Sequence, residues 1–277
     1  MNDSLAGKNI LVTGANTGIG RITAEVLARR GAKVTLACRS EEKTRPVLEG
    51  IRASGGKADF LDLDLADLDS VRTAATTWLA RDEPLHVLVN HAGLAGHRGT
   101  TKQGFELTFG VNHLGPFLLT ELLLPRLRES TPARIVNVSS RSHYRAPRVG
   151  VPFAELRRST PSTTGVTEYS VSKLCNVLFT KELARGKAGE GITSVSLHPG
   201  VVATEIWRRL PFPLRQISNL FMKSPEDGAA TTLHCVTSPA IVDGAYYDSC
   251  KEKRASKLAH DEALAKELWT KSEAWTR

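Results

Sequence analysis

The sequence predicts an α/β protein, because short apolar, β-prone runs alternate with helical patterns along most of its 277 residues. The connections between these runs are short, which favours a parallel sheet with helices on both faces. Strands are predicted at residues 9–13, 33–38, 58–63, 85–90, 134–138, 193–197 and 245–247. A first helix ends near Arg30, and further helices are predicted at residues 41–53, 68–80, 102–127, 168–185, 225–235 and 257–271. We therefore expect a single doubly wound, Rossmann-type domain.

Composition is that of an ordinary soluble globular chain, with 41% hydrophobic and 24% charged residues. No run approaches the roughly 17–25 apolar residues that span a bilayer. The first residues lack the charged and apolar regions of a signal peptide, so we expect a cytoplasmic protein. We interpret the cysteines as reduced thiols and expect no metal site, because they lack CxxC spacing; they are Cys38, Cys175, Cys235 and Cys250.

The chain carries a formal net charge of +8, which would suit nucleic acid or an anionic membrane surface as a partner. Its basic residues are spread out, however, and the denser groups fall in predicted loops and near the C-terminal end. A solvated basic surface explains that distribution without a polyanionic partner. We expect no nucleic-acid partner, whereas peripheral contact with a membrane stays open.

A glycine-rich turn lies between the first strand and the first helix, with Gly14, Gly18 and Gly20 in GxxxGxG spacing. Glycines let the backbone approach a phosphate closely, and a helix N-terminus supplies free N–H groups and the positive end of its dipole. Any turn from strand to helix can also contain glycines. The placement nevertheless favours a dinucleotide site, which would be formed by Gly14, Asn16, Thr17, Gly18, Ile19 and Gly20.

Arg39 directly follows the second predicted strand, where NAD-selective folds carry an acid that binds the ribose 2′-hydroxyl. An arginine there favours the 2′-phosphate of NADP instead. An exposed arginine after a strand can also be without function. We predict NADP(H) in preference to NAD(H), with Arg39 as the residue that selects it.

Tyr169 and Lys173 are four residues apart in a predicted helix, so they lie on one face and can touch. A tyrosine hydroxyl has a pKa of about 10 and exchanges protons poorly at neutral pH unless a nearby positive charge stabilises the phenolate. Lys173 would supply that charge. Such pairs are common on helix surfaces, so the spacing alone does not decide their role.

Several motifs occur in an order that resembles the short-chain dehydrogenases/reductases: the glycine turn, Asn90-His91-Ala92-Gly93, Asn112, Ser139-Ser140, Tyr169 with Lys173, and His198-Pro199-Gly200. Residues 110–115, 172–179 and 246–250 look like the retinol dehydrogenase-like branch. The resemblance covers the whole chain and implies an oxidoreductase that transfers a hydride between nicotinamide and a carbonyl or alcohol. It implies one domain over residues 1–277, with a cofactor part at about 1–135 and a catalytic and substrate part at about 136–277.

The resemblance also implies four catalytic roles. Tyr169 would donate a proton in reduction and accept one in oxidation, with its pKa lowered by Lys173 and by the oxidised nicotinamide. Lys173 would also hold the nicotinamide ribose hydroxyls. Ser140 would hydrogen-bond the substrate oxygen, and Asn112 would help to hold a water that connects Lys173 to bulk solvent. In isolation, Asn112 could be a solvated polar residue and Ser140 an ordinary turn or cap serine.

Further cofactor contacts are implied after the third, fourth and sixth strands. Asp64 would lie near the adenine, with Asp62 close enough to leave the register open. The other implied contacts are Leu65, Asn90, Ala92, Gly93, Pro199, Gly200, Val202 and Thr204. His91 departs from the family's Asn-Asn-Ala-Gly pattern, and we interpret it as a structural histidine.

The segment 205–224 follows the proline-glycine motif, where the family places a lid over the substrate. Its aromatic and leucine residues suit a mostly apolar aldehyde, ketone or retinoid-like substrate, although they could equally contact a membrane or pack on the domain. Helices 102–127 and 168–185 resemble the family's dimer faces, which leaves a homodimer possible. The alternative function is a dinucleotide-binding regulatory or scaffold protein without physiologically relevant turnover.

Overall fold

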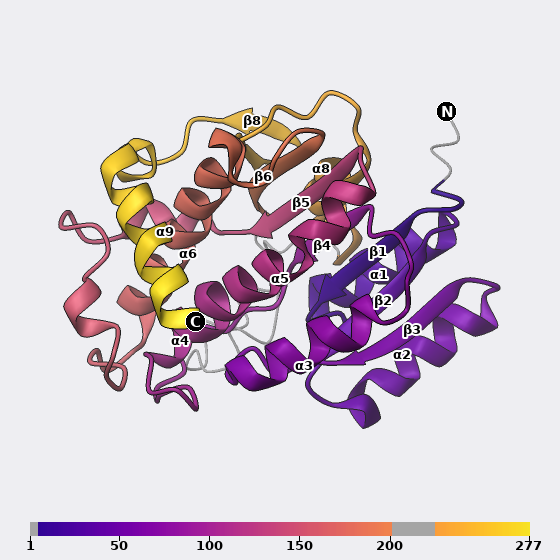
Figure 1. The fold of residues 1–277 in the computed structure, drawn as a ribbon, viewed down its shortest axis with the longest axis horizontal. Coiled ribbons are helices and arrows are strands. Elements are labelled where there is room, and N and C mark those ends of the chain that lie inside the picture. The colour runs from indigo at the N-terminus through magenta and orange to yellow at the C-terminus, as the bar shows by residue number, and fades with distance from the viewer. Residues whose placement is uncertain (1–4, 201–224) are drawn as a thin grey trace, which may run out of the picture.

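The architecture is one eight-stranded sheet with helices on both faces (Figure 1). The computed structural model describes residues 5–200 and 225–277. The strands are β1 Asn9–Thr13, β2 Lys33–Cys38, β3 Lys57–Asp62, β4 Val87–Asn90, β5 Ala133–Val138, β6 Ile192–His198, β7 Tyr246–Asp248 and β8 Lys251–Lys253. They are arranged in the order β3-β2-β1-β4-β5-β6-β7-β8. The predicted doubly wound α/β class is confirmed.

One feature of the sheet differs from the expected parallel arrangement. Strands β1 to β7 are all parallel to their neighbours, whereas β8 pairs with β7 in the antiparallel direction. The sequence did not predict β8, because its residues Lys251, Glu252 and Lys253 are all charged and exposed. Charged side chains suit an edge strand, since they discourage pairing with another chain.

Helices cover the two faces of the sheet in two groups. The α-helices are α1 Gly18–Arg29, α2 Glu41–Ala53, α3 Leu68–Leu79, α4 Leu107–Phe109, α5 Gly115–Glu129, α6 Val166–Glu182, α8 Pro225–Thr237 and α9 Glu262–Thr276. One core lies under α1, α2 and α8, and the other lies under α3, α5, α6 and α9. Short 3₁₀ helices at Arg141–Arg145, Phe153–Glu155 and Lys257–His260 and π-helical turns at Gly110–Leu114 and Leu183–Lys187 complete the described elements.

The long helix predicted over 102–127 begins later than expected and contains a π-helical turn. The Glu106 carboxylate accepts the Phe109 backbone N–H at 2.7 Å and caps the helix, which therefore starts at Leu107. The Gly110–Leu114 turn is π-helical, and π-bulges of this kind are frequent at functional sites. Asn112 lies in this turn.

By length and composition, the continuous helical stretch Leu107–Glu129 could cross a membrane, although the sequence predicted no such segment. Within its most apolar window, 78% of the residues are buried inside the protein. Its leucines and phenylalanines face α3, α6 and the sheet. The apolar character of this helix is therefore explained by its place in the core.

The C-terminal helix α9 lies across α5 and α6 (Figure 1). Trp269 of α9 packs against Phe117 of α5 and Phe179 of α6, with ring centroids 5.0 and 5.7 Å apart. Every residue of α6 from Ser170 to Phe179 is buried within the chain. α9 therefore packs mainly against α6, and the expected homodimer stays a prediction.

Candidate active site

The glycine turn folds tightly on itself at the carboxyl end of β1. A Cβ on Gly20 would lie 2.4 Å from the Gly14 carbonyl oxygen, and a Cβ on Gly14 would lie 2.8 Å from the Cα of Ala92. Gly14 also has a φ of +66°, a conformation that favours glycine. The first and third glycines of the motif are therefore required by close backbone approach, as their spacing predicts.

The N-terminus of α1 leaves its first N–H groups available. Thr17 occupies the N-cap without a capping hydrogen bond from its side chain within the described structure, and the first turn contains no acidic residue. Thr17 and Gly18 are exposed, whereas Ile19 is buried against Ala229 of α8 and can offer only its backbone. Free N–H groups at the positive end of a helix dipole suit an anion, so this turn fits a dinucleotide pyrophosphate.

Cys38, at the end of β2, lies beside this turn, a role that no sequence pattern indicated. Burial raises the pKa of the Cys38 thiol, and hydrogen bonding with Thr44 and with the backbones of Ala15, Asn16 and Gly14 opposes that rise. Cys38 is therefore a buried thiol that lies against the glycine turn. Arg39 follows it directly and is exposed, with its side chain free to approach a ligand beside the turn.

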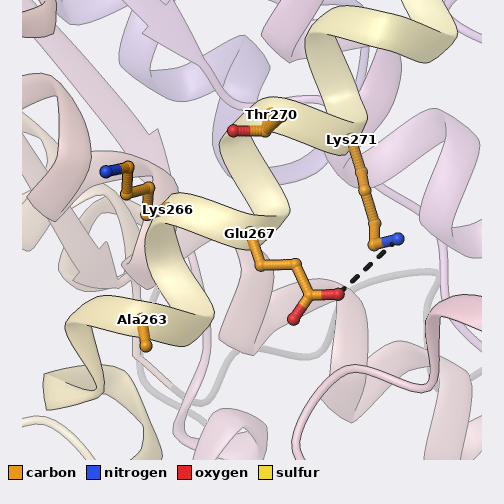
Figure 2. Close-up of a pocket in the computed structure, with 5 residues that line it drawn as sticks. All are labelled: Ala263, Lys266, Glu267, Thr270 and Lys271. Atoms are coloured by element: carbon orange, nitrogen blue, oxygen red, sulfur yellow. Dashed lines mark ion pairs between the residues drawn. The ribbon is translucent and has the colours of Figure 1, made fainter.

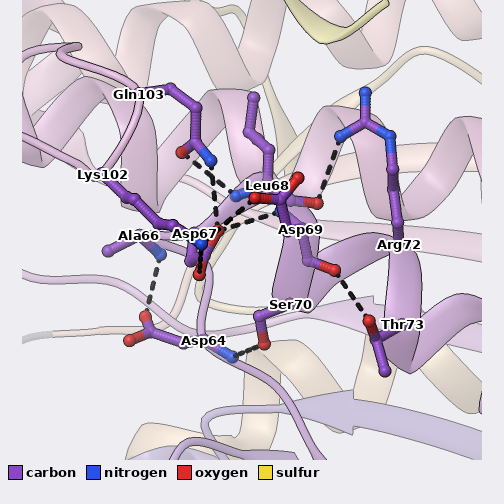
Figure 3. A network of polar contacts seen from close by, with 10 residues as sticks. All are labelled: Asp64, Ala66, Asp67, Leu68, Asp69, Ser70, Arg72, Thr73, Lys102 and Gln103. Atoms are coloured by element: carbon purple, nitrogen blue, oxygen red, sulfur yellow. Dashed lines mark hydrogen bonds and ion pairs between the residues drawn. The ribbon is translucent and has the colours of Figure 1, made fainter.

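Asp64 lies in the turn between β3 and α3, where Figure 3 shows its surroundings. Its Oδ1 accepts the Ala66 N–H at 2.9 Å, and its own N–H donates to Ser70 at 3.0 Å. Asp62 is instead the last residue of β3 and pairs with Cys38. This register makes Asp64 the acid that follows the strand, although its contact with an adenine stays a prediction.

The neighbouring Asp67 anchors the loop that precedes the π-helical turn (Figure 3). Its carboxylate contacts the Lys102 ammonium at 2.8 Å and the Gln103 amide at 3.1 Å, and it caps α3 through the Asp69 N–H. The hydrogen bond from Lys102 lowers the pKa of Asp67 to about 2. The buried Leu65 packs closely against Gly115 at the start of α5. A Cβ on Gly115 would lie 2.6 Å from the Leu65 carbonyl oxygen.

The loop after β4 is held by hydrogen bonds to both sides. The backbone N–H groups of His91 and Ala92 both donate to the Thr13 hydroxyl at 3.0 Å. The Asn90 side chain instead points into the sheet, where it donates to Thr120 at 3.0 Å and to Asn137 at 2.9 Å. The Asn90 side-chain amide thus joins β4 to β5 and α5. Only the backbone of Asn90 is available for the predicted cofactor contact.

Gly93 lies between two of the predicted catalytic residues. A Cβ at this position would be 3.3 Å from both Asn112 Oδ1 and Lys173 Nζ. The Asn112 amide pairs with the Leu94 backbone in both directions, at 2.8 and 2.9 Å, and also donates to Ser172 at 3.0 Å. The side chain that we expected to hold a water is thus occupied in fixing the Gly93-Leu94 loop, and a relay role for Asn112 stays a prediction.

Lys173 is buried beneath the loop after β5, with 3% of the residue exposed. Its ammonium donates to the Val138 carbonyl at 2.8 Å, and burial lowers its pKa to about 8. The Ser139 hydroxyl donates to the Lys173 carbonyl at 2.7 Å, which ties α6 to the end of β5. No sequence pattern indicated this role of Ser139, because a structural contact between distant segments leaves no local signal.

Tyr169 lies beside Ser140, whose side-chain hydrogen bond lowers the pKa of the phenol. Burial has the larger and opposite effect, so the pKa of Tyr169 is raised above its ordinary value. Lys173 Nζ lies 5.6 Å from the centroid of the Tyr169 ring. In the chain without cofactor, Lys173 therefore does not lower the pKa of Tyr169 as we expected. A lowered value requires a further positive charge, such as an oxidised nicotinamide.

The remaining predicted contacts follow β6. Pro199 and Gly200 come directly after this strand, and Gly200 has a φ of +102° that favours glycine. Val202, Thr204 and the expected lid at 205–224 lie outside the described residues. The described candidates from the glycine turn, β4, β5, α6 and β6 meet at the carboxyl edge of the sheet, where β1 and β4 form the topological switch point.

A shallow hollow also lies on the outer face of α9 (Figure 2). Its lining comes from this helix alone, and Glu267 pairs with Lys271 across it at 3.6 Å. No second element contributes a described lining residue, and none of the predicted catalytic residues lies there. The hollow has no arrangement of groups that would orient a substrate.

The fold and the site define a dinucleotide-dependent oxidoreductase acting on CH–OH or C=O groups. The family model described as short chain dehydrogenase matches residues 8–152. The chain is 44% identical to human retinol dehydrogenase 11 over 272 residues, covering 96% of this chain and 84% of that protein. It is 40% identical to human retinol dehydrogenase 13, with coverage of 97% and 84%. The chain belongs to the short-chain dehydrogenase family and is retinol dehydrogenase-like.

Solved structures agree with this assignment. An uncharacterised protein from Mycobacterium paratuberculosis superposes with a TM-score of 0.80 at 33% identity, covering 99% of this chain and 94% of that one. A short chain dehydrogenase from Burkholderia cenocepacia, in complex with NADP, gives a TM-score of 0.72 at 28% identity, with coverage of 88% and 96%.

Proposed function

We propose that this chain interconverts a mostly apolar carbonyl compound and its alcohol with NADP(H), and that retinoids belong to its substrate class. The observation that carries this proposal is the meeting of Ser140, Tyr169 and Lys173 at the edge of the sheet that also carries the glycine turn. The names of the similar retinol dehydrogenases support the substrate class. Arg39 and a similar structure that holds NADP support the choice of cofactor.

The chain's own residues would perform the proton chemistry. A bound nicotinamide dinucleotide supplies the hydride, or accepts it in the oxidative direction. During reduction the Tyr169 hydroxyl gives its proton to the substrate oxygen. During oxidation the Tyr169 phenolate removes the proton from the substrate alcohol. Ser140 donates a hydrogen bond to the substrate oxygen as charge develops there. Lys173 provides a positive charge beneath the phenol and orients the nicotinamide ribose.

The function is tested by NADPH oxidation with a panel of carbonyls: all-trans-retinal, a long-chain aldehyde, a steroid ketone and benzaldehyde. We expect the Tyr169→Phe variant to lower kcat by about a hundredfold to ten-thousandfold, because a general acid contributes that much. Tyr144→Phe is the matched control, since Tyr144 is 49% exposed. Equal turnover by the parent and Tyr169→Phe would refute the role of Tyr169. Tight NADPH binding without turnover of any carbonyl would favour a dinucleotide-binding regulatory protein.

Cofactor choice is tested by titrating NADPH and NADH separately by fluorescence. Arg39→Ser should weaken NADPH binding by about tenfold to a hundredfold, because a hydrogen bond to a charged group contributes about 1.5–3 kcal/mol. NADH binding should stay unchanged. Arg45→Ser is the control, since Arg45 is an exposed arginine of the adjoining helix α2. An equal loss for both cofactors, or tighter binding of NADH by the parent, would contradict this role.

A further inference from the structure

The turn that carries Ser140 is a short 3₁₀ helix, Arg141–Arg145, for which Ser140 is the N-cap. The Ser140 hydroxyl accepts the Ser142 N–H at 3.1 Å and donates to the Ser142 hydroxyl at 3.3 Å, and the Ser140 carbonyl accepts the His143 N–H at 3.1 Å. These bonds are local and weak by themselves. A turn of five residues needs support from elsewhere to keep one hydroxyl aligned with a partner on another helix.

The imidazole of His143 provides such support. Its Nδ1 lies 2.6 Å from the Ser140 carbonyl oxygen, and its Nε2 lies 3.1 Å from the backbone nitrogen of Ser256. A carbonyl oxygen can only accept and a backbone N–H can only donate, so Nδ1 carries the hydrogen and Nε2 accepts. His143 is therefore a neutral bridge between the serine turn and the segment that follows β8.

The bridge is buried and tightly packed. His143 is 1% exposed, and its ring meets the Tyr246 ring of β7 edge-on at a centroid distance of 4.7 Å. Burial lowers the pKa of His143, which agrees with the neutral form that the two hydrogen bonds require. The next tie along the turn is the bidentate pair between Arg141 and Asp248, at 2.6 and 3.0 Å. These two contacts and a third, from the Tyr144 hydroxyl to the Arg254 carbonyl, fix the Ser140 turn to the C-terminal part of the chain, and only the His143 contact acts directly on the Ser140 peptide unit.

We propose that His143 is a positioning residue that holds the Ser140 hydroxyl against Tyr169 by fastening the Ser140 carbonyl to the Ser256 backbone. The proposal rests on the proposed catalytic roles of Ser140 and Tyr169. His143 itself contacts the Ser140 carbonyl and the Ser256 backbone, and has no role in contacting substrate or cofactor. Its effect is transmitted through one peptide unit, because the Ser140 carbonyl and side chain share the same Cα.

The first test compares three variants with the carbonyl that the parent reduces fastest in the panel. His143→Phe keeps a ring against Tyr246 but loses both hydrogen bonds, and should lower kcat by about tenfold to a hundredfold, since small misplacements of reacting groups cost that much. His143→Asn keeps a donor near the position of Nδ1 and should recover part of the loss. Tyr144→Phe removes a hydroxyl that donates to the Arg254 carbonyl at 2.5 Å, and should leave kcat unchanged.

A double-mutant cycle separates positioning from general destabilisation. If His143 acts through Ser140, His143→Phe should lower kcat in the parent but have no further effect in Ser140→Ala. The KM for NADPH should stay unchanged throughout. An undiminished loss in the Ser140→Ala background, or a parent-like kcat for His143→Phe, would overturn the proposal while leaving the role of Ser140 intact. A fully active Ser140→Ala variant would instead refute the proposed function of that serine.

A second readout does not depend on turnover. The chain has four tyrosines, so the ¹³Cζ resonance of Tyr169 can be assigned with Tyr169→Phe after labelling with ¹³Cζ-tyrosine. Ser140→Ala should shift this resonance, because it removes the hydroxyl that lowers the pKa of the neighbouring phenol. His143→Phe should reproduce that shift, and Tyr144→Phe should not. An unchanged Tyr169 resonance in folded His143→Phe would refute the proposal even if no carbonyl in the panel is reduced.

Discussion

The glycine turn and the catalytic cluster share one edge of the sheet but are built in opposite ways. The turn depends on missing side chains, because Gly14 and Gly20 leave room for backbone atoms that a single methyl group would displace. The cluster depends on buried polar side chains, with Lys173, Asn112 and Ser139 each bonded to backbone of another segment. Substitutions in the turn should therefore act through steric overlap. Substitutions in the cluster should act through buried charge and lost hydrogen bonds.

The largest expected effect is in the glycine turn, where two alanine substitutions, compared with a third at the end of α2, separate backbone strain from steric overlap. Gly14→Ala combines a φ of +66° with a contact of 2.8 Å, Gly20→Ala adds a contact of 2.4 Å, and Gly55→Ala adds only a φ of +81° in open space. We expect Gly14→Ala to cost about 2–5 kcal/mol of unfolding free energy and Gly55→Ala about 1 kcal/mol. Thermal unfolding and NADPH titration measure both effects.

NADPH binding should separate the two turn variants from the Gly55 variant. Gly14→Ala and Gly20→Ala should also weaken NADPH binding, because the turn that presents the α1 N–H groups must move. Gly55→Ala lies at the end of α2 and should bind NADPH like the parent. If all three variants lost stability equally and bound NADPH equally, the steric account of the turn would be wrong.

The catalytic cluster should instead respond to pH through the buried Lys173. Its pKa is about 8 in the folded chain against an ordinary value of 10.5. Between these two values the unfolded chain binds more protons, so this lysine makes folding more favourable as the pH rises from about 8 to 10.5. Lys173→Met should remove this rise, whose size is up to about 3 kcal/mol.

Urea unfolding of parent and variant at pH 7.5, 9 and 10 measures this difference. The Val138 carbonyl keeps a partner in Lys173→Met, because Asn176 also donates to it at 3.1 Å. Lys57→Met is the control, since Lys57 is an exposed lysine of β3. Parallel curves for the parent and Lys173→Met would show that the ammonium is not buried as described.

The two regions also differ in how much of them the sequence could predict. Gly14, Gly18 and Gly20 are close together and directly follow a strand, so their spacing alone indicates a tight turn. The contacts that hold Ser140 join residues 107 to 113 positions apart, as in Arg141 with Asp248 and His143 with Ser256. No local pattern reports such pairs, because they form only when β7 and the segment after β8 reach the end of β5.

Partial predictions have a physical explanation as well. The type and order of the helices followed from apolar periodicity, whereas the start of α4 depended on a cap by Glu106 and the start of α9 on a cap by Asp261, which accepts the Leu264 N–H at 3.0 Å. The pKa of Tyr169 depends on burial and on Ser140, which sequence spacing does not measure. Spacing identified the catalytic candidates but not the environment that sets their protonation.

His91 lies where the two regions meet and should give the smallest effect. Its Nδ1 lies 3.1 Å from the position of a Cβ on Gly20, and its buried Nε2 has no partner among the described residues. Burial lowers the pKa of His91 to about 4, with a smaller contribution from the charge of Lys173. The ring is therefore neutral at pH 7, and we expect His91→Asn to change the unfolding free energy there by less than about 1 kcal/mol.

The same substitution should alter the response to acid. A histidine whose pKa is lowered by folding binds fewer protons in the folded chain, so stability falls as the pH drops from 6.5 towards about 4. His91→Asn should lose less stability than the parent over this range, while its kcat at pH 7 stays at the parent value. His97→Asn is the control, because His97 is an exposed histidine in the loop after β4. A large loss of kcat in His91→Asn would mean that this histidine belongs to the catalytic cluster. His91 would then have to be grouped with Lys173, Asn112 and Ser139 and not with the glycine turn.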